Sequence, residues 1–89
     1  MIEIYWDESF KRNYKKLIKH NLELENKFQN KVEIFQSNPF HQSLKTHKLS
    51  GKLQNYWAFS INLEFRIVFR FIDDNSVLFT AIGTHDDVY

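Results

Sequence analysis

Two histidines and an arginine are the residues of this chain best suited to chemistry on a phosphate. His85 follows a glycine in the C-terminal segment GTHDDVY (residues 83–89), and a histidine just past a strand can act as a general acid or base. Arg66 lies alone on the polar side of an expected strand, where a guanidinium can bind a phosphate with two hydrogen bonds. His47, in the basic segment LKTHKLSG (residues 44–51), is a candidate base.

Glu64, at the tip of an expected hairpin, is a further candidate base. A base for the 2′-hydroxyl, a cation for the pentavalent phosphate and an acid for the leaving 5′-oxygen are what RNA transesterification needs. The sequence has no metal-ligand spacing, P-loop or GxSxG motif, so we expect neither a metal nor a cofactor. A second interpretation stays open, in which His85 is an exposed loop residue and Arg66 pairs with Glu64 or Asp86.

The composition of the chain excludes several other classes of protein. Its 89 residues predict one domain, residues 1–89. The absence of cysteine excludes disulfide scaffolds, zinc ribbons and thiol catalysis. No apolar run approaches the roughly 20 residues of a transmembrane helix, and the charged N-terminus is not a signal peptide. We therefore expect a soluble cytoplasmic protein with no membrane partner.

Positive charge is concentrated in the first part of the chain. Residues 1–54 contain ten Lys and Arg against six Asp and Glu, whereas residues 55–89 contain two against five. Such a basic half could contact phosphates, or it could simply be the solvated face of a helix. The candidate RNA-binding residues are Lys11, Arg12, Lys15, Lys16, Lys19, Lys45 and Lys48.

Hydrophobic periodicity indicates the elements that position these residues. Alternation over residues 2–6 predicts a short strand, and apolar residues three and four apart predict helices over about 8–20 and 22–37. From about residue 46 the period becomes two, which predicts three strands joined by short, antiparallel connections. The pattern predicts an α+β fold of order β-α-α-β-β-β, a helical hairpin packed on an antiparallel sheet.

The last expected hairpin brings two of the candidate residues together. If its turn pairs Ile72 with Val77, Arg66 lies opposite Gly83. His85 then lies diagonally from Arg66 on the same face, within reach of long side chains.

The preceding hairpin is expected to have a three-residue loop at 63–65. That length keeps the polar Ser60 and Asn62 on the face of Arg66, whereas a four-residue loop would mix polar and apolar side chains. The helices are therefore expected on the opposite face of the sheet. That apolar face carries Trp57, Phe59, Ile61, Ile67, Phe69 and Phe71.

Four segments, in the order of these elements, resemble the RelE/YoeB/YafQ superfamily of toxins of type II toxin–antitoxin modules. They are NPF at 38–40, LKTHKLSG at 44–51, FRIVF at 65–69 and GTHDDVY at 83–89. The resemblance covers essentially the whole chain. The His-x-Leu-x-Gly and Gly-Thr-His motifs are similar to the YafQ-like branch, whereas the Arg-Ile-Val-Phe strand is closer to RelE and YoeB. The resemblance implies a ribosome-dependent, metal-independent endonuclease that cuts mRNA in the A site.

The resemblance also implies roles for individual residues. His47 matches the histidine of the His-x-Leu-x-Gly motif, and His85 matches that of the Gly-Thr-His motif. Arg66 matches the strand arginine that RelE and YoeB direct at the scissile phosphate. Glu64 aligns with an acidic residue just before that strand, and Tyr89 matches a terminal aromatic residue that stacks or assists near the cut base.

Two positions depart from the YafQ-like pattern: a further histidine of that branch falls here on Ser60, and Arg66 stands where that branch has an apolar residue. His85 is expected to be the acid and Arg66 to bind the phosphate, while either His47 or Glu64 is the base. The expected partners are a cognate antitoxin that folds on binding, the ribosome with mRNA in its A site, and operator DNA through the antitoxin only. The alternative is a non-catalytic RelE/ParE-like member, which poisons gyrase or acts as a corepressor with its antitoxin.

Overall fold

Two helices form the first half of the molecule. In the computed structural model, which describes residues 1–89, α1 spans Glu8–Ile18 and α2 spans Leu22–Ser37. Asp7 and Asn21 cap them, each accepting a hydrogen bond from the backbone N–H three residues on. The second helix has the predicted bounds. The first ends two residues before the predicted end because His20, at φ 62°, adopts the left-handed conformation that breaks the helix.

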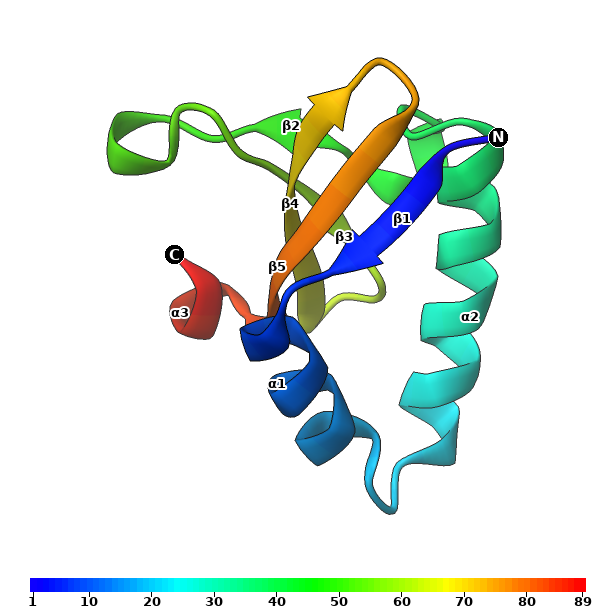
Figure 1. Cartoon of the computed structure of the whole chain (residues 1–89). Helices are drawn as coiled ribbons and strands as arrows, with labels where there is room; N and C mark the ends of the chain where they lie inside the picture. The colour runs from blue at the N-terminus through cyan, green and yellow to red at the C-terminus, as the bar shows by residue number, and fades with distance from the viewer.

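The strands form one five-stranded sheet in the order β1-β5-β4-β3-β2 (Figure 1). Their bounds are β1 Glu3–Trp6, β2 His47–Lys48, β3 Trp57–Ser60, β4 Phe65–Asp73 and β5 Ser76–Thr84. The α+β fold and the order of its main elements are confirmed. All pairs are antiparallel except β1 with β5, which is parallel. A parallel pair needs a long crossover, and both helices and three strands lie between β1 and β5.

The helices pack on the predicted apolar face of the sheet. The ring of Phe35 in α2 lies 4.7 Å from Phe59, 5.0 Å from Phe69 and 5.6 Å from Phe79, measured between centroids. Phe10 in α1 lies 5.3 Å from Phe79. Because all of these rings are fully buried, the helices cover this face of the sheet. The other face carries Ser60 and Arg66 together with the buried Ala58 and Val68. None of the helices has the length and apolarity needed to cross a membrane.

The hairpin of β4 and β5 contains two irregularities that offset each other. Val77 pairs with Phe71 and not with Ile72 as predicted, because Ile72 is an extra residue in β4. A second shift, further along, leaves one residue of β5 without a partner. The register therefore returns to the predicted value, and Arg66 lies opposite Gly83.

The connection between β3 and β4 is longer than the three-residue loop predicted. Ser60 pairs with Arg66, so five residues separate these two paired positions, of which Phe65 already belongs to β4. The side chain of Asn62 closes this turn by accepting hydrogen bonds from the backbone N–H groups of Glu64, at 2.9 Å, and Phe65, at 2.7 Å. The number of residues between the two paired positions is still odd, so Ser60 lies on the same face of the sheet as Arg66, as expected.

Candidate functional site

The side chain of Tyr89 brings together three of the residues predicted from the sequence. The guanidinium carbon of Arg66 lies 5.7 Å from the centroid of the Tyr89 ring, a cation–π distance. The ring of His85 packs edge-on at 4.5 Å between centroids. The Tyr89 hydroxyl lies 3.4 Å from Nε2 of His47, which comes from the opposite side of the site. We refer to His47, Arg66, His85 and Tyr89 as the tyrosine cluster.

A short helix, α3 (His85–Val88), positions two members of this cluster. Thr84 and Asp87 form a capping box: Asp87 N–H donates to the Thr84 hydroxyl at 3.4 Å, and Thr84 N–H donates to the Asp87 carboxylate at 3.1 Å. His85 and Tyr89, four residues apart, therefore lie on the same side of the turn. The sequence interpretation placed His85 in a loop, although a threonine three residues before an acidic residue is a recognisable capping signal.

Gly83 allows α3 to fold back against the sheet. The residue is buried opposite Arg66, and a Cβ atom built on it would lie only 2.7 Å from the Cβ of Asp87. Carbon atoms do not approach so closely, so any side chain here must push α3 away from β5. The glycine beside His85 is thus required by close backbone approach, as the sequence suggested.

Gly83→Ala is expected to displace α3 and disperse the tyrosine cluster. The methyl group overpacks the contact with Asp87, at a cost of roughly 1–3 kcal/mol in the free energy of unfolding. Urea unfolding measures this cost, and NMR cross-peaks between the Tyr89 ring and the Arg66 side chain report the displacement. Thr84→Ser, which keeps the capping hydroxyl, is the control. Unchanged stability with the cross-peaks retained in Gly83→Ala would contradict this role.

Arg66 makes none of the ion pairs that would give it a purely structural role. The ion pairs in the structure are Lys11 with Glu8, at 3.4 Å, and His85 with Asp86, at 3.6 Å. The Nε atom of Arg66 is buried and has no hydrogen-bond partner. The guanidinium therefore has no hydrogen-bond partner within the protein, and its terminal nitrogens are available to bind an oxyanion from a ligand.

His47 is held in one tautomer by its own chain. Its Nδ1 lies 3.0 Å from the backbone carbonyl oxygen of Lys45, an acceptor, so Nδ1 carries the hydrogen and donates it. In the neutral imidazole Nε2 is then the nitrogen without a hydrogen, and it faces the Tyr89 hydroxyl. Pairing of His47 with Ala58 in β3 fixes the backbone. This arrangement leaves a nitrogen lone pair inside the cluster that can accept a proton.

Glu64 lies apart from the tyrosine cluster. It is exposed in the connection between β3 and β4 and lines a shallow pocket with Asn21, Glu23 and Leu24, near the start of α2. No member of the tyrosine cluster lines that pocket. Of the two candidate bases, the structure therefore brings only His47 next to the other site residues. No group of three or more metal-ligating side chains is close enough together to hold a metal ion.

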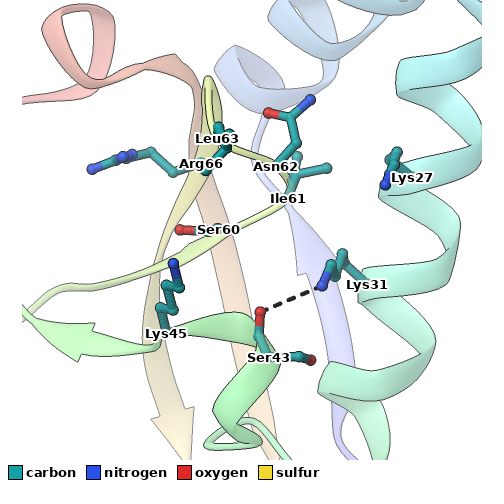
Figure 2. A pocket seen from close by; sticks show the side chains of 9 residues that line it. All are labelled: Lys27, Lys31, Ser43, Lys45, Ser60, Ile61, Asn62, Leu63 and Arg66. Carbon is teal, nitrogen blue, oxygen red and sulfur yellow. Dashed lines mark hydrogen bonds between the residues drawn. The ribbon is translucent and has the colours of Figure 1, made fainter.

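The predicted cations surround the site in three groups. One group is exposed on α1 or at its C-cap: Lys11, Arg12, Lys15, Lys16 and, at the C-cap, Lys19. Lys16 lines a pocket with Asp87 and Val88 of α3. Lys48 lines a hollow of about 300 Å³ together with His47 and Tyr89. Lys45 lines another hollow, of about 340 Å³, with Arg66 (Figure 2). Two further lysines of this last hollow, Lys27 and Lys31, were missed in the sequence because α2 was considered only for its apolar face.

Comparison with known proteins identifies the family. The family model described as bacterial toxin of type II toxin–antitoxin system, YafQ, matches residues 2–89. No curated protein matches the sequence significantly.

Solved structures share the fold at low sequence identity. The YoeB/ParE toxin from Agrobacterium tumefaciens has a TM-score of 0.81 and 20% identity, over 94% of this chain and 99% of that one. YafQ from E. coli strain BL21(DE3) has a TM-score of 0.80 and 18% identity, over 100% and 99%. The E. coli DinJ–YafQ toxin–antitoxin complex gives 0.78 and 18%, over 99% and 97%. Since the family model spans nearly the whole chain, this protein belongs to the YafQ family of bacterial type II toxin–antitoxin toxins.

Proposed function

We propose that this toxin cleaves mRNA on the ribosome, by attack of a ribose 2′-hydroxyl on the adjacent phosphate. The observation that carries the proposal is the tyrosine cluster. It places two histidines and an arginine against one tyrosine, on a face that the core leaves open. A protein that acts only by binding has no need for titratable groups gathered in this way.

Arg66 is the group that binds the scissile phosphate. Its neighbours across the sheet are Ser60 and Gly83, both small, so an anion has room beside the guanidinium. The two terminal nitrogens of the guanidinium can donate hydrogen bonds to two phosphate oxygens. As negative charge grows on the pentavalent phosphate, this preorganised cation binds it more strongly than the ground state.

His47 and His85 are the base and the acid. The 2′-hydroxyl gives its proton to Nε2 of His47 as its oxygen bonds to phosphorus, and the bond to the 5′-oxygen breaks as His85 supplies a proton. The products are a 2′,3′-cyclic phosphate and a 5′-hydroxyl, so atoms and charge balance without a metal or water. Glu64 is the less favoured base because no contact joins it to the cluster. Tyr89 holds the histidines and offers its ring to a base of the RNA.

The proposed partners are an antitoxin and the ribosome. E. coli YafQ and Staphylococcus aureus YoeB each form a complex with an antitoxin, DinJ and YefM respectively. We infer that a cognate antitoxin covers the tyrosine cluster of this chain, and that an acidic segment of it is attracted by the exposed cations of α1. Operator DNA is then bound only through the antitoxin. The same α1 cations and Lys48 contact ribosomal RNA when the antitoxin is absent, and the cytoplasm is the proposed site of action.

The test of this function is expression of the toxin without antitoxin. Translation and growth should stop, and primer extension on translated messages should reveal new 5′ ends inside codons. Co-expression of the cognate antitoxin should restore growth. Growth arrest without new mRNA ends, accompanied by DNA damage, would instead support the gyrase-poisoning alternative. Unimpaired growth at full expression would support a non-catalytic corepressor.

A further inference from the structure

A basic hollow lies beside the tyrosine cluster, between α2, the end of β3 and the segment before β2. Its volume is about 340 Å³. The polar and charged residues that line it and matter here are Lys27, Lys31, Lys45, Ser60, Asn62 and Arg66. In Figure 2, the two α2 lysines lie on one side and Lys45 on another, while the guanidinium of Arg66 points away from α2. Arg66 therefore forms the boundary between this basic hollow and the tyrosine cluster.

The positive charge of the basic hollow is not neutralised within the protein. Four cations line it, Lys27, Lys31, Lys45 and Arg66, and no acidic residue does. None of the four takes part in an ion pair, since the ion pairs involve other residues. A concave surface lined by charges of one sign concentrates the potential and attracts counter-ions.

The remaining lining favours a phosphate over a nucleobase or a peptide. The carbonyl oxygen of the Asn62 side chain accepts two backbone hydrogen bonds, so its amide nitrogen is left to donate outwards. Ser60 supplies a hydroxyl, which in Figure 2 points away from α2, as the Arg66 guanidinium does. Lysine, arginine, serine and asparagine are the usual donors to backbone phosphates. No aromatic side chain lines the hollow, so a base has no ring to stack on.

We propose that the basic hollow binds a backbone phosphate of the substrate RNA, next to the phosphate that is cleaved at the tyrosine cluster. The inference rests on the proposed function, and it adds a second phosphate site that fixes the position of the strand. Arg66 belongs to both sites, because it lines the hollow and lies against Tyr89. A phosphate site carries no sequence information, so the hollow strengthens binding to every sequence alike.

The test uses the purified protein and a short single-stranded RNA in which every 2′-hydroxyl is methylated, so that it cannot be cleaved. Fluorescence anisotropy of the labelled RNA, at several salt concentrations, measures binding. The variant Lys27→Gln/Lys31→Gln should bind roughly tenfold more weakly at low salt, whatever the sequence. The slope of log affinity against log salt should also fall by about 0.7 for each phosphate that the variant no longer binds.

Two controls separate a built site from general charge. Lys52→Gln removes one positive charge from the exposed η2 turn (Gly51–Leu53), which does not line the hollow. Lys52→Gln should lower the affinity for RNA clearly less than Lys27→Gln, which removes the same charge from an exposed position on α2. Lys31→Arg keeps the charge and should retain most of the affinity.

Several results would overturn the proposal. They are equal losses in Lys27→Gln and Lys52→Gln, an unchanged affinity in the double variant, or no RNA binding by the unmodified protein at low salt. A loss of affinity for ribosomes with an empty A site, without a loss for the short RNA, would assign the hollow to ribosomal RNA. If the double variant lost as much affinity for poly-glutamate as for RNA, the basic hollow would instead be assigned to an acidic peptide. Binding as predicted in a protein that cuts no mRNA would refute the proposed function and leave the phosphate site standing.

Discussion

Replacing His85 by alanine is expected to slow mRNA cleavage by roughly 10²–10⁴-fold, the usual contribution of a general acid or base. The side chain is exposed on the first turn of α3, where its ring contacts Tyr89 and the neighbouring Asp86, so its loss leaves the core intact. Single-turnover cleavage of mRNA in a programmed ribosome measures the rate. The toxin concentration for half-maximal cleavage should change little, because the imidazole acts mainly in the transition state.

His20 provides the matched control for this prediction. It is also exposed, but it lies in the left-handed turn between α1 and α2, where asparagine is well tolerated. His20→Asn should cleave at the rate of the unmodified toxin. If His85→Ala did so as well, His85 could not be the acid.

Arg66→Ala is the second large effect, with an expected loss of roughly 10²–10³-fold in the cleavage rate, as for other preorganised groups that stabilise transition-state charge. The stability of the folded state should change much less than the cleavage rate. The substitution removes a buried Nε that has no partner, and the strand neighbours Ser60 and Gly83 keep their backbone pairing. A thermal unfolding midpoint within a few degrees of the original would separate the chemical loss from a structural one.

Two arginine variants sharpen this test. Arg66→Lys keeps the charge but not the fork, so it should recover only part of the rate. Arg70→Ala removes the other arginine of β4, four residues away, which lines none of the hollows around the site. Equal losses in Arg66→Ala and Arg70→Ala would mean that the net charge of β4, and not a phosphate contact, controls the rate.

The sequence predicted the layers of this fold because periodicity and capping are local properties. Apolar spacing indicated the side of the sheet that faces the helices, and together with Pro39, which disfavours a helical residue before it, the bounds of α2. The register of β4 with β5 could not be predicted in this way. Extra residues such as Ile72 arise from the twist of the two strands, which no single segment encodes. The pairing of Arg66 with Gly83 was predicted correctly only because a second irregularity, in β5, cancels the one-residue shift at Ile72.

The candidate site was predictable in its members and not in its geometry. His47, Arg66, His85 and Tyr89 were all chosen from motifs, but nothing in the sequence indicates that the Tyr89 side chain joins them. That arrangement depends on α3, whose capping box can be recognised at Thr84, and on the close approach allowed at the preceding glycine. His47 and Tyr89 are 42 residues apart in the sequence, and only the tertiary structure brings them together. The sequence alone therefore could not decide whether His47 or Glu64 is the base.

The base can now be tested by pH dependence. Both His47→Gln and Glu64→Gln remove a candidate proton acceptor, yet only His47 belongs to the tyrosine cluster. We predict that His47→Gln abolishes the fall in cleavage rate at low pH and lowers the rate at its maximum, whereas Glu64→Gln keeps the profile of the unmodified toxin. The reverse assignment would make Glu64 the base.

Whether the tyrosine cluster catalyses attack by the 2′-hydroxyl is tested most directly by the chemistry of the cut ends. Purified ribosomes carrying mRNA with an open A site are incubated with the toxin, and the termini of the mRNA fragments are analysed. We predict cleavage inside the A-site codon, with a 2′,3′-cyclic phosphate upstream and a 5′-hydroxyl downstream. Methylation of the 2′-hydroxyl at the cut position should prevent cleavage. A 3′-hydroxyl on the upstream fragment, or cleavage next to a methylated 2′-oxygen, would contradict this mechanism.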